Sequence, residues 1–244
     1  MKFNAVTCVF MSVTNKKNST PSKYHLDKDT LEQKNMVKYL GVTIDNKLTF
    51  DKHIKEKTKS ATKILNMFHR NLYFAPKSVK YKAYMKCVLP VIEYASNCWS
   101  PTSEKMNNLI EMVQHNAARF ISNVYIKKGN FKKYSVTKIL NDLKLNTIQE
   151  RRNQARLTMA YKILHGHVIL KSNLLPKYDS YNPKRHCNTA KVGKEYQLME
   201  QNANLQIIGH TFFFSIPKLW NQMVTPKQAK APSVEAFQRH FKQT

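Results

Sequence analysis

The stretch KYLGVTID, Lys38 to Asp45, decides the fold together with the Leu48, Phe50, His53 and Ile54 that follow it. Apolar and polar side chains alternate along the stretch, as they do in a strand with one buried face. Its glycine, Gly41, permits a sharp bend or a close backbone approach inside that pattern. The stretch therefore predicts a β-hairpin that feeds a long basic helix.

The period of the sequence changes at Asp51, a residue that suits a helix N-terminus by capping or by its charge. Apolar residues then recur at helical spacing, at Ile54, Ala61, Ile64, Leu65, Phe68 and Leu72. Basic residues occupy much of the rest, at Lys52, Lys55, Lys59, Lys63 and Arg70. Two interpretations of this basic face stay open, a solvated surface and a surface that tracks phosphate groups.

Further helices are predicted downstream, with a loop-rich segment over residues 171–209. Pro90 is expected to end or kink the second helix, which begins at Pro76 or Lys77 and runs to Val88. A broad apolar stripe predicts the strongest helix from about Ser103 to Val124. The others are expected over 135–143, from the Thr147/Glu150 capping box onward, over 211–223 and over 233–241.

Three arginines, Arg151, Arg152 and Arg156, fall in the first turns of the helix that follows Thr147. Cations at the positive end of a helix carry a modest electrostatic penalty. We therefore expect an anionic neighbour, either an acidic group of the protein or a nucleic-acid backbone. Arg119, on the helix before it, points away from the apolar stripe, so it is expected to meet a phosphate or a surface carboxylate.

The net charge is +26, from 41 Lys and Arg against 15 Asp and Glu. It is spread as +8, +11 and +7 over residues 1–70, 71–170 and 171–244. A field of this size favours a polyanionic partner such as nucleic acid. The four cysteines lack the spacing of a zinc site, which predicts a reduced, intracellular protein, in nucleus or cytoplasm, without a metal site. No stretch approaches the roughly 20 apolar residues that span a bilayer.

Several short motifs occur in one order along most of the chain. They are Lys38–Asp45, Ser60-Ala61 with Leu65, Arg70-Asn71-Leu72, Val88-Leu89-Pro90, Glu93-Tyr94-Ala95, Trp99-x-Pro101, Gln114 with Ala117–Ile121, Ser135-Val136-Thr137 and Arg151-Arg152. In this order the chain resembles the reverse transcriptases of non-LTR (LINE, jockey-like) retrotransposons. The resemblance covers the passage from palm to thumb and the tail, where Phe212-Phe213 and Trp220-Asn221 also match.

The resemblance implies that the hairpin is the primer grip, with Tyr39, Leu40 and Gly41 beside the 3′ end of the growing strand. It also implies that the intact enzyme holds two Mg²⁺ ions with an adjacent pair of aspartates and a third upstream. This chain contains no Asp-Asp pair. Because Met1–Asn4 resembles the segment after that hairpin, the fingers and most of the palm are expected to precede Met1.

We therefore expect an α+β, mainly α fold with a palm-edge β region (1–50), an antiparallel helical thumb-like domain (51–170) and a loop-rich helical tail (171–244). The expected function is template–primer binding by a polymerase fragment without catalytic residues or a cofactor of its own. An upstream polymerase segment is a second expected partner. The expected contacts are Lys52, Lys55, Lys59, Lys63, Arg70, Arg119, Arg151 and Arg152. The alternatives are an independent basic α-helical interaction protein and a non-functional retrotransposon relic.

Overall fold

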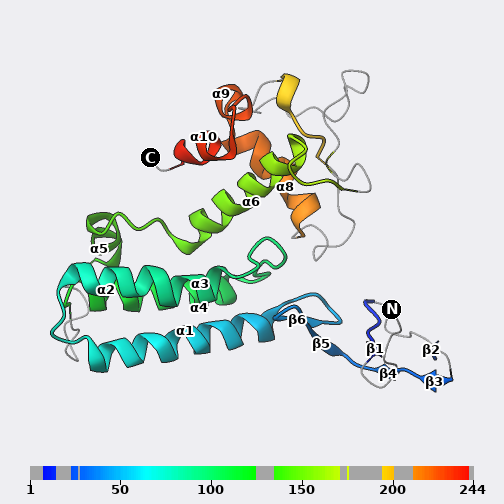
Figure 1. Cartoon of the computed structure of the whole chain (residues 1–244), viewed down its shortest axis with the longest axis horizontal. Helices are drawn as coiled ribbons and strands as arrows, with labels where there is room; N and C mark the ends of the chain where they lie inside the picture. Colours follow the sequence, from blue (N-terminus) through cyan, green and yellow to red (C-terminus); the bar gives the residue numbers. More distant parts are fainter. Residues whose placement is uncertain are drawn as a thin grey trace.

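The helix expected from Asp51 is present as α1 (Asp51–Asn71). The computed structural model describes residues 8–14, 23–26, 28–124, 135–170, 175, 194–200 and 211–241. Helix α1 buries the apolar stripe that its sequence predicts, including Ile54, Ala61 and Leu65. Figure 1 shows it as a long rod that begins next to the strands and runs the length of the lower helical layer.

The hairpin is formed by β5 (Met36–Tyr39) and β6 (Val42–Asp45), which pair antiparallel with Tyr39 opposite Val42. Leu40 and Gly41 form the two-residue turn, with φ of 45° and 79°. Positive φ at both central positions is the geometry of a type I′ turn, which matches the right-handed twist of the paired strands. The predicted bend at glycine is thus confirmed.

Leu40 is an unfavourable residue for this turn, because a leucine at positive φ brings its Cβ too close to the following carbonyl oxygen. Its side chain is 75% exposed and gains little from burial. The substitution Leu40→Asn is therefore expected to stabilise the protein by about 0.5–1 kcal/mol, since Asn-Gly is the favoured pair in type I′ turns. A urea midpoint unchanged or lowered relative to wild type would contradict this turn geometry.

The strands before the hairpin are short. β1 (Val9–Phe10) pairs in parallel with β4 (Glu32–Gln33), and β2 (His25–Leu26) pairs antiparallel with β3 (Asp29–Thr30). The partner of β2 is thus the next strand along the chain rather than β1.

The second helix does not end at Val88, as Pro90 led us to expect. It continues from α2 (Lys77–Ala83) through a π-helical segment, η2 (Tyr84–Val88), into α3 (Leu89–Glu93). A π-segment adds a residue to the turn, so the N–H of Leu89 bonds the carbonyl of Tyr84, five residues back. The widened turn accommodates a proline that lacks an N–H and would clash in a regular α-helix.

Helix α4 (Glu104–Ile121) begins at the N-cap Ser103 as predicted and packs along α1. Helices α1 and α4 run in the same direction, and the α2–α3 rod between them in sequence runs back (Figure 1). Connections between successive rods are short, as expected for neighbours that reverse direction. A first hydrophobic core fills the space between them, with Ile54, Tyr84 and Phe120 among its fully buried members.

Helix α5 (Val136–Asp142) leads to α6 (Ile148–Leu164), whose Thr147/Glu150 capping box is confirmed. A second core joins α6 to the C-terminal helices, with Phe237 stacked on both Tyr161 and Trp220. These helices are α8 (Phe212–Met223), α9 (Pro226–Ala229) and α10 (Val234–Arg239), next to a 3₁₀ turn, η4 (Lys194–Tyr196). Most of the loop-rich segment expected over 171–209 lies outside the described residues.

The architecture is α+β and mainly α, as the sequence predicts. Short strands gather at the N-terminal end, and helices form the rest of the described fold (Figure 1). No helix within the described residues is long and apolar enough to cross a membrane.

Candidate nucleic-acid interface

A single stripe of exposed cations runs along α1, at Lys52, Lys55, Lys59, Lys63 and Arg70. Their spacings of three, four, four and seven residues return to the same side of a helix with 3.6 residues per turn. The buried residues Ile54, Ala61 and Leu65 lie on the opposite side. Packing of α1 into the core therefore holds all five cations outward on one edge.

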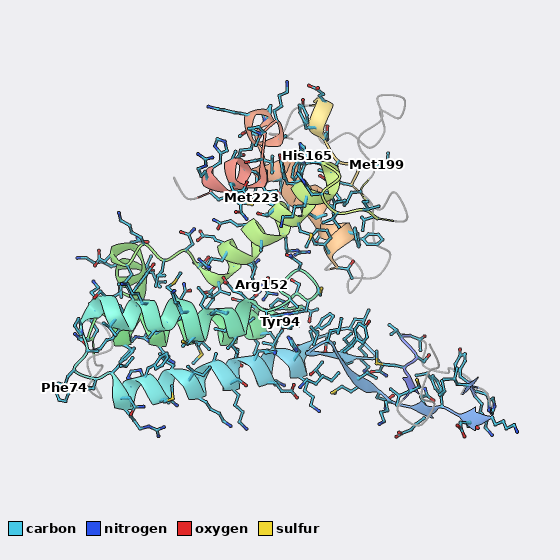
Figure 2. The ribbon with its side chains drawn as sticks, viewed as in Figure 1. Phe74, Tyr94, Arg152, His165, Met199 and Met223 are labelled. Carbon is cyan, nitrogen blue, oxygen red and sulfur yellow. The ribbon has the colours of Figure 1, made fainter. Side chains whose placement is uncertain are left out.

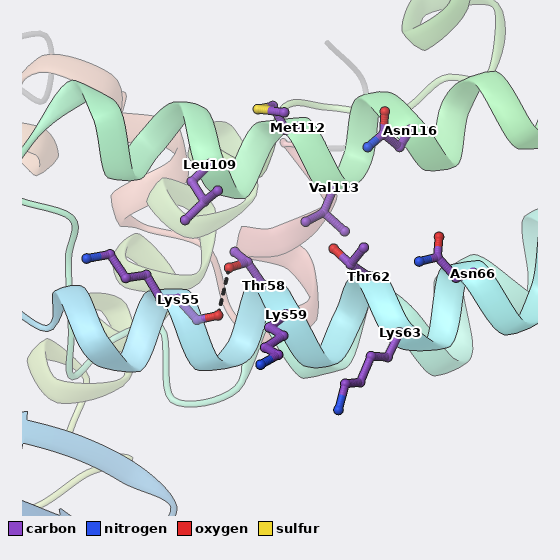
Figure 3. Close-up of a pocket in the computed structure, with 10 residues that line it drawn as sticks. All are labelled: Lys55, Thr58, Lys59, Thr62, Lys63, Asn66, Leu109, Met112, Val113 and Asn116. Atoms are coloured by element: carbon purple, nitrogen blue, oxygen red, sulfur yellow. Dashed lines mark hydrogen bonds between the residues drawn. The ribbon is translucent and has the colours of Figure 1, made fainter.

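The stripe borders a groove between α1 and α4 with a volume of about 580 Å³ (Figure 3). Its α1 wall is Lys55, Thr58, Lys59, Thr62, Lys63 and Asn66, and its α4 wall is Leu109, Met112, Val113 and Asn116. A second hollow of about 740 Å³ shares Lys55, Leu109 and Met112 with it and continues to Glu104, Lys105 and Asn108. The two hollows form one channel along the parallel helices.

Polar and apolar groups have separate places in the channel. The Thr58 hydroxyl donates to the Ile54 carbonyl oxygen at 2.8 Å, so it serves the helix. Met112 from the α4 wall is 55% exposed despite being apolar. Asn116 accepts a hydrogen bond from Arg119 Nη1 at 3.1 Å, which places Arg119 next to the groove and binds it to an amide. An extended polyanion with flat bases suits this combination of lysines, amides and an exposed thioether.

The tip of the hairpin lies against Tyr94. The Tyr94 hydroxyl donates to the Leu40 carbonyl oxygen at 2.8 Å, and Lys57 Nζ lies 5.1 Å from the centre of the tyrosine ring. A Cβ at Gly41 would lie 3.3 Å from Tyr94 Cε1, so glycine serves this close contact as well as the turn. Tyr39, with 65% of its surface exposed, and Leu40 remain open to a ligand.

Two hydrogen bonds from Thr43 fix β6 to the first turns of α1. The Thr43 N–H donates to His53 Nδ1 at 3.1 Å, and the Thr43 hydroxyl donates to Glu56 Oε2 at 2.9 Å. Together with the Tyr94 contact, they hold the predicted primer-grip residues in a set position relative to the lysine stripe. Sequence patterns gave no indication of Tyr94 or His53 in this role.

His53 is fully buried and neutral, because its Nδ1 accepts the Thr43 hydrogen bond. Burial, and then the positive charge of Lys57, lowers its pKa from 6.5 to about 4. The unfolded chain therefore takes up a proton near pH 6.5 that the folded protein refuses until about pH 4. The neutral state of His53 therefore costs no free energy of unfolding above pH 6.5, and the free energy of unfolding falls as the pH drops from 6.5 towards 4.

The expected loss at pH 5 is on the order of 2 kcal/mol from His53. Burial also lowers the pKa of His69 and His115, which adds to the loss in the same direction. Urea unfolding of wild type and His53→Gln at pH 7.5 and pH 5 measures the effect. The difference in free energy of unfolding between the two proteins should be smaller at pH 5 than at pH 7.5. An unchanged difference would contradict the lowered pKa of His53.

The predicted contacts Arg151 and Arg152 have partners inside the protein. Arg151 forms a two-point ion pair with Glu93, with Nε 2.5 Å from Oε1 and Nη2 3.2 Å from Oε2. This hydrogen-bonded pair raises the pKa of Arg151. Arg152 is 3% exposed, lies 4.0 Å over the Trp99 ring and donates to the Trp99 carbonyl oxygen at 2.7 Å. Their role in nucleic-acid binding stays a prediction.

The α4 wall of the groove was missed by sequence reasoning. Leu109, Met112 and Asn116 recur every three or four residues, at the edge of the apolar stripe, and could have been found there once α1 was placed beside α4. No group of three or more His, Cys, Asp or Glu side chains in the described ranges could hold a metal ion.

Comparison with known proteins finds similarity to two transposon polymerases and to one uncharacterized protein. The chain is 28% identical over 151 residues to a Drosophila melanogaster protein named probable RNA-directed DNA polymerase from transposon BS, a match that covers 60% of this chain and 16% of that protein. It is 26% identical over 141 residues to the corresponding protein of transposon X-element, over 57% of this chain and 15% of the relative. An uncharacterized Caenorhabditis elegans protein is 27% identical over 157 residues, which cover 62% of this chain and 76% of that protein.

No family model and no solved structure matches the chain. The chain spans about a sixth of the length of the two transposon polymerases. The two transposon polymerases belong to the family that the ordered motifs between Lys38 and Arg152 resemble. The chain is related to the RNA-directed DNA polymerases of non-LTR retrotransposons.

Proposed function

We propose that this chain is a C-terminal portion of a LINE-type RNA-directed DNA polymerase that holds template–primer nucleic acid in the channel between α1 and α4. In this proposal residues 1–50 form the palm edge, 51–170 the thumb and 171–244 the tail. The hairpin tip at Tyr39, Leu40 and Gly41 lies beside the primer end. Binding of this kind takes place in the nucleus or the cytoplasm.

The unpaired lysine stripe carries the proposal. None of Lys55, Lys59 and Lys63 has an ion-pair partner within the described residues. Their positive charge is therefore not neutralised by the protein itself, and phosphate contacts release the counterions of a nucleic acid. Similarity to two transposon polymerases supports the same class of ligand.

The length of the stripe suits a nucleic-acid strand. Eight residues of helix separate Lys55 from Lys63, which corresponds to about 12 Å along the axis. A strand of a B-form duplex rises about 3.4 Å per nucleotide, so the three lysines span roughly three to four phosphates. Such contacts position a duplex and carry little sequence information.

The proposal includes binding without polymerisation by this chain alone. Two-metal nucleotidyl transfer uses carboxylates that hold both ions, and the adjacent aspartate pair of the family is absent from this sequence. The Mg²⁺ ions of an intact enzyme would be held by a polymerase segment elsewhere. Nucleotide incorporation by the purified chain that survives substitution of Tyr39 and Gly41 would contradict this part.

Binding to a labelled RNA–DNA hybrid across a salt series tests the proposal. Three or more phosphate contacts predict that log K falls with log salt with a slope of about −2 to −3 or steeper. Fluorescence anisotropy of the folded chain measures the affinity at each salt concentration. No binding at low salt, in a sample with the expected helical circular dichroism, would contradict the proposal.

A second candidate, an independent basic interaction protein, is favoured by one observation. The match to the Caenorhabditis elegans protein covers 76% of that protein, so a related segment exists in a chain not much longer than the match. An acidic protein partner would be captured with a shallow salt slope, whereas duplex nucleic acid requires a steep one. The same salt series therefore separates the two candidates.

A further inference from the structure

A small, partly open cavity lies apart from the α1–α4 channel, between the start of α8 and the residues just before α1. Its volume is about 240 Å³. Three aromatic side chains form much of its wall, Phe50 before α1, Trp99 and Phe212 at the start of α8. Arg156 from α6 contributes a cation to the same wall. Figure 2 shows the neighbouring Arg152 on α6 where this helix faces the helices below it.

Arg156 is 9% exposed and has no carboxylate partner within the described residues. Its Nη2 donates to the Ser215 hydroxyl and, at 3.5 Å, to the Thr211 carbonyl oxygen. Its Nε has no hydrogen-bond partner in the described part of the chain. Burial lowers the pKa of this guanidinium. A buried cation with an unused donor carries a desolvation penalty unless an anion accompanies it.

Arg152 reinforces the positive charge one helical turn before Arg156. Its Nη1 also lacks a hydrogen-bond partner in the described ranges. Burial, and then the charge of Arg156, lowers the pKa of Arg152 to about 10. The acids whose charge acts on it are Glu111 and Glu93, but neither bonds it, and Glu93 is held by Arg151. Within the described residues no carboxylate forms an ion pair with either buried guanidinium group.

The start of α8 adds a second feature that favours an anion at this cavity. Helix α8 has 12 residues and begins after the N-cap residue Thr211. Thr211 and Phe212 both line the cavity, so the positive end of the helix faces it. Backbone N–H groups at such an end bind phosphate readily. Ser100 and Thr102 bring two hydroxyl groups to the lining.

We propose that this cavity binds a phosphate group between Arg156 and the N-terminus of α8. Donors that converge from a guanidinium, a helix end and hydroxyl groups match a tetrahedral anion with several acceptor oxygens better than a flat carboxylate. The cavity is smaller than the roughly 300–1,000 Å³ of sites for whole drug-sized ligands, so it holds the phosphate group itself and leaves the rest of a larger ligand outside. The phosphate comes from the end of a nucleic-acid strand or from a free phosphate compound.

Calorimetric titration of the full chain with inorganic phosphate tests the site, with thermal unfolding as a second readout. Saturable one-site binding and a rise in Tm with phosphate concentration are expected. Arg156→Gln should weaken binding at least tenfold. Ser100→Leu, which fills the cavity and leaves Arg156 in place, should do the same and decides the question if the arginine variant fails to fold. Lys162→Gln, on the same helix but outside the cavity, should bind as wild type does.

Two further experiments separate this site from the channel and identify the source of the phosphate. The variant Lys55→Glu/Lys59→Glu/Lys63→Glu should retain inorganic phosphate binding, because its changes lie in the channel and not in this cavity. The phosphate site is therefore tested independently of the proposed function. A 5′-phosphorylated dinucleotide that binds tenfold tighter than phosphate identifies a strand end, and equal affinity identifies a free compound. Absence of saturable binding, undiminished binding by Ser100→Leu, or equal competition by acetate would overturn the proposal.

Discussion

Replacing Lys55, Lys59 and Lys63 together by glutamate is expected to weaken binding to an RNA–DNA hybrid by about 100-fold near 0.1 M salt, or roughly 3 kcal/mol. The change removes three phosphate contacts from one wall of the channel and places three like charges beside the strand, which adds repulsion. All three side chains are exposed and make no ion pair within the described residues, so folding should be unaffected. Fluorescence anisotropy with a labelled hybrid measures the loss.

A matched control separates local contact from general charge. Lys77, Lys82 and Lys86 are also exposed, lie on the α2–η2 rod and line neither hollow of the channel. Their replacement by glutamate changes the net charge by the same six units. We expect a loss of less than about fivefold from this control, through the weaker long-range field alone. Equal losses in the two triple variants would contradict a binding surface on α1.

The substitution Asp45→Ala is expected to lower the free energy of unfolding by about 2–4 kcal/mol. The Asp45 carboxylate accepts hydrogen bonds from the N–H groups of Lys47, Thr49 and Phe50, at 3.0, 3.1 and 2.8 Å, and from the Thr49 hydroxyl at 3.0 Å. Burial raises its pKa, but these bonds outweigh burial and hold the pKa below the usual value. The carboxylate thus organises the whole connection from β6 to α1.

The effect is large because α1 has no side-chain cap of its own. Its N-cap residue, Phe50, is left-handed with φ of 59°, and Leu48 also has a positive φ of 54°. Asp45 holds this unfavourable backbone and satisfies the Phe50 N–H. Asp45→Asn keeps one acceptor oxygen and should lose roughly half as much. A loss below about 1 kcal/mol for Asp45→Ala, measured by urea unfolding, would show that the connection is held by other contacts.

The helical periodicity of apolar residues in the sequence predicted most of the helices, because each helix buries a stripe of residues that recur every three or four positions. Helix α1, helix α4 and the capping box of α6 follow directly from such signals. A local change in helix type is harder to predict from the sequence. Nothing local indicated that a π-segment would carry the chain through Pro90.

Residues that act through distant partners escaped prediction for a physical reason. Asp51 was expected to suit the start of α1 by capping or by its charge, and it lies in the first turn, where its charge favours the positive end of the helix. The connection before α1 is held instead by Asp45 on the preceding strand, which no local pattern indicated. Lys80 belongs to a residue type that usually faces solvent, but it is fully buried, with its Nζ bonded to the Tyr73 carbonyl oxygen at 2.8 Å and to Asn123. These contacts join parts of the chain that no sequence period links.

The arginines of α6 illustrate the same limit. Their position at the positive end of a helix predicted an anionic neighbour, and for Arg151 this neighbour is Glu93, 58 residues away. Sequence reasoning left open whether the anion belonged to the protein or to nucleic acid. For Arg151 the ion pair with Glu93 decides that the anion belongs to the protein, while Arg156 lacks an acidic partner within the described residues.

The salt dependence of hybrid binding, compared between wild type and the neutral variant Lys55→Gln/Lys59→Gln/Lys63→Gln, tests the central claim most directly. Each phosphate contact contributes about 0.9 to the slope of log K against log salt for a B-form duplex. If these lysines contact phosphates, the slope of the variant should be shallower by about 2–3. An identical slope for both proteins would show that the α1–α4 channel does not hold the nucleic-acid backbone.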